Sequence, residues 1–500
     1  MMTTKSLRVA AAVGVLSLLL GTAPARAQSL DEALRLFKDG ELADAALMFY
    51  DVLLNDPNPD RRDQAEVYLA ATLRKMDILV PALFYYQDIF KAGPENRYYL
   101  NAIQGLLEVQ KGLRDPFFVP LIIDRNFDAE GFGRLSPDKI GRINYLIGEL
   151  TLRRGENDDA KLFLEYVPPE HPLYAQARYL LGVLTIQRGD AKGALQHFQA
   201  VLQHVDVEAD DDELQRVRNL SLLASARTEY GRGNFQRAID FYEQVPRFSR
   251  EWFYALYEAA WPYFRLDEYG KALGTLQSAT SPFFAKRHVP EAYVIRGTTY
   301  FVNCQWDRVR RAVKRFKRVY DPMVEELDGY LGNGREAVDY YRDVVAGGDG
   351  QFSIEVAREV RRRTRFKKYH YVLQHMQWEL EEIERVEAWR NSRLADDLRS
   401  IVADQREQLQ PVVGSWVKSR LQFILDQLKH FQNQNNILDF EVTDAERKWL
   451  EQGKEILKGR RARLPRPEIP NDQWQHWNFE GEYWKDELGY IQHSLRTECF

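Results

Sequence analysis

Small and apolar residues recur along this chain in a pattern that repeats every 34 residues. The segments 145–167 and 179–201 align without gaps, so that Gly148 corresponds to Gly182 and Ala160 to Ala194. A period of this length is typical of stacked units, each of which buries an apolar face against its neighbours. Extending the alignment gives seven repeats, which begin near residues 26, 63, 141, 175, 219, 253 and 290.

Two columns of the alignment hold small residues. One column is Ala33, Ala70, Gly148, Gly182, Ala226, Ala260 and Gly297, and the other is Ala45, Ala82, Ala160, Ala194, Ala238, Ala272 and Val309. Thirteen of the fourteen positions are Ala or Gly, which argues against a chance alignment. Because short side chains let two antiparallel helices approach closely, each repeat is predicted to be a helix pair.

Larger apolar residues follow the second column at helical spacing, and Pro57, Pro94 and Pro172 close three repeats. Over about residues 28–323 this pattern resembles the tetratricopeptide-repeat (TPR) family. The resemblance implies an all-α fold, a TPR-type right-handed α-solenoid. It also implies a concave face that is lined by the first helix of each repeat and binds peptides or protein segments.

The predicted organisation has repeats one and two in residues 28–96 and repeats three to seven in residues 141–323. Between them, residues 97–140 do not fit, since Asp115-Pro116 and Ser136-Pro137 interrupt the helical pattern, and we expect a degenerate repeat and a loop. The acidic insert at 206–213 is expected to be a solvated loop.

Residues 324–500 lack the repeat and are predicted to form a helical C-terminal module. After a glycine-rich break at 347–350, a long charged helix is expected over residues 353–408. Pro411 and Gly414 are expected to separate it from a second helix at 416–431, giving a helical hairpin packed on the last repeats. The aromatic-rich end, residues 469–500, is expected either to dock onto this hairpin or to form a partner-binding patch.

Residues 1–27 have the pattern of a cleavable signal peptide. Lys5 and Arg8 precede a short apolar run at 9–20, and Ala25-Arg26-Ala27 fits a cleavage site, so we expect export to a bacterial periplasm. No later segment contains an apolar run that is long enough to predict a transmembrane span. Export would permit a disulfide between Cys304 and Cys499, the two cysteines of the chain, and the sequence leaves open whether they pair.

No catalytic pattern stands out. The nine histidines lack metal-ligand spacing, phosphate-loop and nucleophile-elbow motifs are missing, and so is the Glu-Ser pair of periplasmic lytic transglycosylases. We therefore predict no enzyme activity, no cofactor and no metal. A net charge of −5 argues against nucleic acid. The basic runs Arg308–Arg318 and Arg358–Lys368 are expected to pair with neighbouring acids or to contact an anionic partner or surface.

The first helices of repeats three to six supply the candidate groove. The TPR resemblance implies that their inward positions are Tyr145, Glu149, Arg153, Tyr179, Gln187, Arg227, Tyr230, Tyr257, Trp261 and Arg265. Tyr, Trp and Arg dominate binding hot spots. The alternative is that several of these side chains pack between neighbouring repeats.

The C-terminal sequence Gly481–Tyr490, with Cys499 next to last, looks like that of periplasmic TPR proteins of deltaproteobacteria. Some of those belong to the envelope-spanning gliding-motility machinery of myxobacteria. The sequence thus predicts an exported protein–protein interaction scaffold within a cell-envelope complex. The alternative is a cell-wall (peptidoglycan) enzyme or its accessory factor that uses the C-terminal module.

Overall fold

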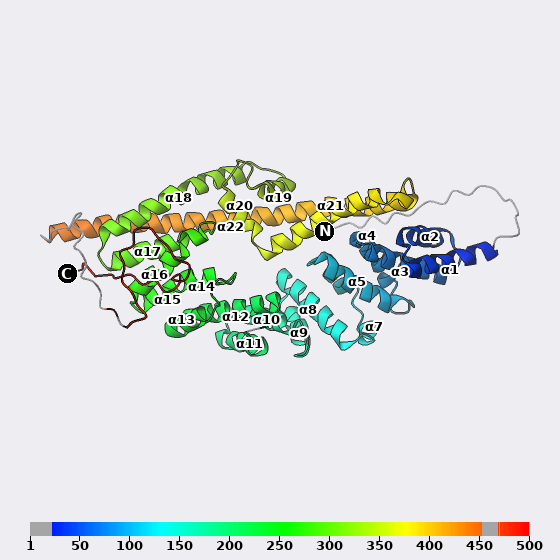
Figure 1. Ribbon diagram of the computed structural model, residues 1–500, viewed down its shortest axis with the longest axis horizontal. Helices are drawn as coiled ribbons and strands as arrows, with labels where there is room; N and C mark the ends of the chain where they lie inside the picture. Colours follow the sequence, from blue (N-terminus) through cyan, green and yellow to red (C-terminus); the bar gives the residue numbers. More distant parts are fainter. Residues whose placement is uncertain (1–22, 208, 453–468, 470, 500) are drawn as a thin grey trace. The chain divides into compact units, whose positions relative to one another are not determined.

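The computed structural model describes residues 23–207, 209–452, 469 and 471–499. All regular elements within these residues are helices, so the predicted all-α class is confirmed (Figure 1). Residues 1–22 of the predicted signal peptide lie outside the described part, and the first helix begins at Ala23. Among the described helices, none is long and apolar enough to cross a membrane.

The seven repeats are helix pairs, whose first and second members we call A and B helices. In chain order the first five pairs are α1 (Ala23–Asp39) and α2 (Leu42–Asn55), α3 (Pro59–Lys75) and α4 (Leu79–Lys91), α8 (Pro137–Arg154) and α9 (Asn157–Glu165), α10 (Tyr174–Gln187) and α11 (Ala191–His204), and α12 (Asp212–Gly231) and α13 (Phe235–Glu243). In the sixth repeat the A helix is divided into α14 (Trp252–Glu258) and α15 (Ala260–Arg265), and the B helix is α16 (Tyr269–Ala279). The seventh pair is α17 (Pro290–Val302) and α18 (Trp306–Gly332). A short 3-10 turn, η1 (Pro282–Phe284), precedes the last pair. This arrangement is a TPR-type α-solenoid.

The two small-residue columns lie where the A and B helices of each pair meet. All fourteen residues are buried. A Cβ atom at Gly148 would lie 2.7 Å from Leu164 Cγ, and one at Gly182 would overlap the Phe198 ring. The helices therefore pack too closely for larger side chains, which is the physical reason for the columns.

Residues 97–140 contain three helices, α5 (Tyr99–Leu113), α6 (Phe118–Arg125) and α7 (Ala129–Gly133). Asp115 is buried, and its carboxylate accepts hydrogen bonds of 2.7–2.9 Å from the amides of Phe117, Phe118 and Val119. A short polar side chain in this position caps a helix. Asp115-Pro116 thus ends α5 and starts α6.

The C-terminal module consists of α19 (Ala337–Ala346), α20 (Ile354–Arg361), α21 (Thr364–Arg385), the 3-10 turn η2 (Glu387–Trp389) and α22 (Arg393–Glu451). The prediction of one charged helix over 353–408 is wrong, because the chain turns twice within it. At the first turn the Arg362 carbonyl accepts a hydrogen bond from Arg250. At the second, Asn391 is left-handed (φ 59°) and Trp389 is fully buried.

The predicted break at Pro411 and Gly414 is also wrong, since both lie inside the 59-residue α22. An apolar stripe runs through this region without interruption, and its members are buried: Val402, Leu409, Val413, Val417, Leu421, Ile424 and Leu428. Burying this stripe outweighs the one backbone hydrogen bond that proline removes. Gly414 is a packing position, because a Cβ there would overlap the Ala337 carbonyl of α19.

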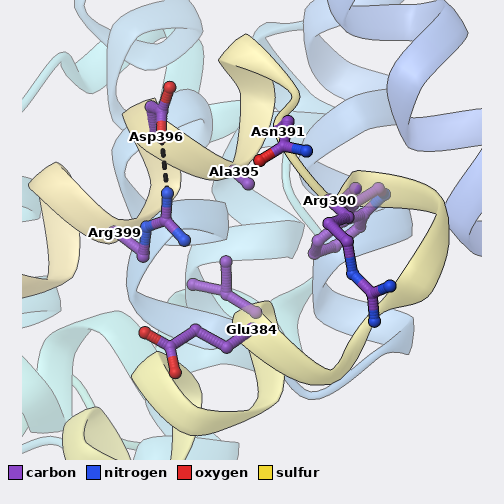
Figure 2. Close-up of a pocket in the computed structure, with 8 residues that line it drawn as sticks. Glu384, Arg390, Asn391, Ala395, Asp396 and Arg399 are labelled. Carbon is purple, nitrogen blue, oxygen red and sulfur yellow. Dashed lines mark hydrogen bonds and ion pairs between the residues drawn. The ribbon is translucent and has the colours of Figure 1, made fainter.

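The described chain forms two compact units, one of residues up to Val109 with Glu379–Ile401 and one of Gln110–Trp378 with Val402 onward. In the first unit, part of the C-terminal module completes the early repeats. Trp389 Nε1 donates to the Ala43 carbonyl (2.9 Å), and buried Glu379 accepts from the Leu79 amide (2.6 Å) at the start of α4. A hollow of about 300 Å³ beside η2 is lined by charged side chains such as Arg390 and Asp396 (Figure 2).

In the second unit, residues 485–499, which we call the C-terminal strap, run along the sixth and seventh repeats. The amides of Gly489, His493 and Glu498 donate to Ser278 Oγ (2.9 Å), the Gly270 carbonyl (3.0 Å) and the Asn303 carbonyl (2.9 Å). The strap therefore docks on the repeats and not on a hairpin, while the predicted partner-binding patch of the aromatic-rich end stays a prediction. The strap fits here because α16 carries Gly274, where a Cβ would overlap the Ile491 carbonyl.

Candidate partner-binding groove

The ten predicted groove residues all lie on A helices of the second unit. Tyr145, Glu149 and Arg153 are on α8, Tyr179 and Gln187 on α10, Arg227 and Tyr230 on α12, Tyr257 on α14, and Trp261 and Arg265 on α15. Gln187, Arg227 and Arg265 are exposed. The structure does not gather the ten into one cleft, because they are distributed over four successive repeats.

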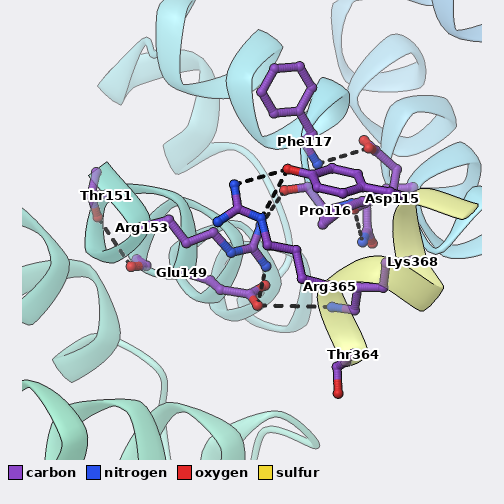
Figure 3. A network of polar contacts seen from close by, with 12 residues as sticks. Asp115, Pro116, Phe117, Glu149, Thr151, Arg153, Thr364, Arg365 and Lys368 are labelled. Atoms are coloured by element: carbon purple, nitrogen blue, oxygen red, sulfur yellow. Dashed lines mark hydrogen bonds and ion pairs between the residues drawn. The ribbon is translucent and has the colours of Figure 1, made fainter. Parts of the chain in front are cut away.

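At α8, the predicted residues contact other parts of the same chain (Figure 3). Arg153 forms an ion pair with Glu149 and donates to the Pro116 carbonyl (2.6 Å). Lys368 Nζ of α21 lies 3.9 Å from Glu149 Oε1. Burial raises the pKa of Tyr145, and the nearby Glu149 carboxylate raises it further. This end of the A-helix surface is therefore partly covered by α21.

In the middle of the array, predicted residues tie neighbouring repeats together. Arg227 of α12 makes two hydrogen bonds, of 2.6 and 2.7 Å, to the Glu258 carboxylate of α14. Trp261 Nε1 donates to Glu291 of α17 (2.8 Å). Contacts of this kind orient one repeat on the next, and a bidentate arginine–carboxylate pair fixes both position and angle.

Three of the remaining predicted residues contact aromatic rings, Tyr179 and Tyr230 in their own repeats and Arg265 in the preceding repeat. The Tyr230 ring lies 5.4 Å from the Phe235 ring, and the Arg265 guanidinium lies over the same ring at 4.7 Å. The Tyr179 ring is 6.0 Å from that of Phe198. These side chains have a packing role in addition to any role in binding.

The α20–α21 junction packs on the A-helix side of the later repeats. Arg216 Nη2 of α12 donates to Thr364 Oγ1 (2.7 Å), and Arg250 Nη2 donates to the Arg362 carbonyl (3.2 Å). Farther along α21, the Tyr371 hydroxyl donates to the Gly112 carbonyl (3.3 Å). The C-terminal module thus covers part of the A-helix side, which the sequence did not indicate.

The two basic runs have different surroundings. In Arg308–Arg318, Arg310 pairs with Glu446 and Lys317 with Asp439 (3.0 Å), both on α22. In Arg358–Lys368, Arg363 pairs with Glu359, and Arg361 donates to the Val345 carbonyl (3.1 Å). Lys367 of the second run is exposed and lines a hollow of about 390 Å³ together with Phe366, His370 and Tyr371.

Cys304 and Cys499 are joined by a disulfide, with their Cα atoms 5.1 Å apart. The bond fixes the end of the C-terminal strap beside α17. Within the part of the chain that the structure covers, no three His, Cys, Asp or Glu residues are grouped so as to hold a metal ion.

Comparisons with known proteins give the following results. No protein-family model matches the chain, and no curated protein matches it. Three solved structures to which it is similar are a tetratricopeptide repeat protein from Parabacteroides merdae (15% identity, 59% of this chain and 93% of that one, TM-score 0.25), pilF of Pseudomonas aeruginosa (13%, 60% and 93%, 0.22) and the quorum sensor NprR from B. thuringiensis (14%, 75% and 99%, 0.30). The description as a TPR-type solenoid rests on the helix pairs and their buried small-residue columns.

Proposed function

We propose that this protein is an exported scaffold without catalytic activity, which binds segments of partner proteins on the A-helix face of its solenoid. The observation that carries the proposal is that side chains join adjacent repeats on this face. Arg227 bonds to Glu258 and Trp261 to Glu291, while Gln187 and Arg265 are exposed on A helices of the same array. A preformed surface loses little entropy on binding, which favours recognition of a partner segment.

Export is supported by the disulfide between Cys304 and Cys499, because disulfides persist in oxidising compartments and are rare in the cytosol. The leader-like residues 1–27 point the same way. We place the protein in the periplasm, within a multiprotein envelope complex such as gliding-motility machinery. The support for that finer assignment is the resemblance of the segment Gly481–Tyr490 and Cys499 to periplasmic TPR proteins of deltaproteobacteria.

The test is affinity purification of the full-length protein from envelope extracts, with two double variants compared side by side. Q187A/R265A removes exposed side chains from A helices. Q199A/R237A is the matched control, since it removes the same residue types from exposed positions on the B helices α11 and α13. We expect the first variant to lose at least one partner that the wild type and the control retain. Equal recovery by all three proteins would refute binding on the A-helix face.

A second candidate function, cell-wall binding, is favoured by one observation. Trp474, Phe479 and Trp484, just before the strap, are 40–49% exposed. Exposed aromatic rings mark binding surfaces, and they can stack on sugar rings. Sedimentation with purified peptidoglycan separates the two functions. Binding that is lost in W474A/W484A, with no stable protein partner recovered, would replace the scaffold proposal.

A further inference from the structure

Three arginines occupy one column of the repeat that the small-residue alignment leaves unexplained. Arg216, Arg250 and Arg287 each lie three residues before the start of the fifth, sixth and seventh repeats, near 219, 253 and 290. We call this set the arginine column. Equivalent positions in successive repeats project from the same side of a solenoid, so the three side chains form a ladder.

Arg250 and Arg287 are held in place by neutral partners, whereas Arg216 contacts both a neutral partner and the Glu213 carboxylate. Arg216 donates to the Thr364 hydroxyl (2.7 Å), Arg250 to the Arg362 carbonyl (3.2 Å), and Arg287 to the Arg250 carbonyl (3.5 Å). Hydroxyl and carbonyl acceptors orient a guanidinium group but do not neutralise it. A guanidinium has five N–H donors, so Arg250 and Arg287 keep donors for another acceptor.

The surrounding charge is strongly positive. Arg362 and Lys367, at the α20–α21 junction, bring the number of cations near the column to five. The acids that contact this group are Glu213, 3.1 Å from Arg216 Nη1, Glu251, 3.8 Å from Arg216 Nε, and Glu359, 3.9 Å from Arg362 Nη1. Glu359 also pairs with Arg363, so its negative charge is shared between two arginines. Burial lowers the pKa of Lys367, and so do the nearby charges of Arg250, Arg216, Arg362 and Arg287.

The cluster is open to solvent at Arg250 and Lys367, which are exposed. Lys367 also lines the 390 Å³ hollow, whose other lining residues include Phe366 and Tyr371. A bound segment would therefore meet cations and an apolar recess side by side. This local excess of positive charge stands out in a chain with 74 acidic and 69 basic residues, whose net charge is negative.

We propose that the arginine column, together with Arg362 and Lys367, binds an acidic segment of a protein partner, whose carboxylates accept the spare guanidinium donors. The inference rests on the proposed scaffold function and names the chemistry of the bound segment. Carboxylates match the planar fork of arginine and bind it in a bidentate manner. The hollow beside Lys367 would receive an apolar side chain of the same segment.

The experiment measures binding of a fluorescein-labelled oligoglutamate peptide to the full-length protein by anisotropy, at low and at physiological salt. R250E/K367E reverses two exposed charges of the cluster. R311E/K314E is the matched control, because it makes the same charge change at exposed positions of α18. We expect R250E/K367E to weaken peptide binding by about tenfold or more, and the control to stay within about twofold of the wild type. Circular dichroism checks the fold, and R250Q/K367Q replaces the reversal variant if that one unfolds.

Equal loss in the two reversal variants would overturn the inference, since it would indicate a response to net charge alone. So would binding of inorganic pyrophosphate without binding of the peptide, which would identify a phosphate site. Failure of this inference can be distinguished from failure of the proposed function. If R250E/K367E leaves peptide binding unchanged while Q187A/R265A still loses an envelope partner, the scaffold proposal stands and the acidic-segment inference falls.

Discussion

The disulfide between Cys304 and Cys499 is predicted to decide whether the C-terminal strap stays on the solenoid. The perturbation is the double variant C304S/C499S, or reduction of the wild-type protein. Both cut the covalent link beside α17 while leaving the strap sequence otherwise intact. The question is whether the non-covalent contacts are sufficient without that link.

The contacts of the strap contribute a modest free energy. Six polar contacts join it to the repeats. The amides of Gly489, His493 and Glu498 donate to repeat residues, Gln305 Nε2 donates to the Arg496 carbonyl, Arg247 Nη2 donates to the carbonyls of residues 485, 486 and 488, and the His493 ring pairs with Gln277. At about 1 kcal/mol each they contribute about 6 kcal/mol. Burial of Leu488, which is 1% exposed, adds about 2 kcal/mol. The Arg247 guanidinium over the Tyr490 ring, at 4.5 Å, adds about 1 kcal/mol.

The conformational entropy lost when the strap is ordered costs more free energy than these contacts contribute. Over residues 485–499, at roughly 0.8 kcal/mol per residue, fixing the backbone costs about 12 kcal/mol against about 9 kcal/mol of contacts. The two cysteines are 195 residues apart in the sequence, and a crosslink that closes so long a loop contributes about 5 kcal/mol. The disulfide therefore makes the bound strap the more stable state by about 2 kcal/mol, and its loss releases the segment.

Hydrogen exchange with mass spectrometry is the assay. In C304S/C499S, amides of the strap peptide should exchange at rates near those of an unstructured chain, whereas α8–α13 should keep wild-type protection. Reduction of the wild type should give the same result. Wild-type protection of Gly489, His493 and Glu498 in the variant would refute the reasoning, because the contacts alone would then hold the strap.

Three further predictions follow from buried or crowded positions. Gly274→Val should displace the strap and speed its hydrogen exchange, because the new side chain overlaps the Ile491 carbonyl, while Gly329→Val at an open helical position should not. Glu379→Ala should lower the free energy of urea unfolding by about 1–3 kcal/mol, since it leaves the Leu79 and Val80 amides without their acceptor; exposed Glu384→Ala should change it by less than about 0.5 kcal/mol. Burial, with Arg296 and Arg308 nearby, lowers the pKa of His493 to about 4, so protonation of this ring favours the released strap. Protection of the strap amides from hydrogen exchange should therefore be full above about pH 6.5 and fall towards pH 4, and His493→Gln should flatten that profile.

The repeat region was largely predictable from the sequence. Short side chains such as Ala45 and Gly148 are required where the two helices of a repeat cross, so these contacts appear in the sequence as small residues at a fixed period. The all-α class follows from the same columns. The large residues behind them, for example Phe49 and Phe198, are fully buried as their spacing indicates.

The C-terminal module was less predictable, because its structure depends on contacts distant in sequence. Pro411 and Gly414 look like helix breakers in isolation, but a buried stripe from Val402 to Leu428 keeps α22 continuous. The strap has no helical period at all, and its position depends on Gly274 and Cys304, roughly two hundred residues earlier. Local patterns carry no signal for such pairings.

The candidate groove was partly predictable. Arg227 and Trp261 lie on A helices as the resemblance implies, but their side chains bind neighbouring repeats. The arginine column was missed, although its offset of 34 residues between Arg216 and Arg250 was visible in the alignment. The contacts of Thr364 and Lys368 with the A helices could not be found from the repeats, because those two residues belong to the module that follows them.

Crosslinking mass spectrometry of the protein in envelope extracts tests the central claim most directly, since lysines mark both faces of the solenoid. Lys367 and Lys368 of α21 border the A-helix face, whereas Lys161 of α9 and Lys192 of α11 lie on B helices. The account predicts that partner peptides crosslink predominantly to Lys367 and Lys368. Crosslinks concentrated on Lys161 and Lys192 would contradict it.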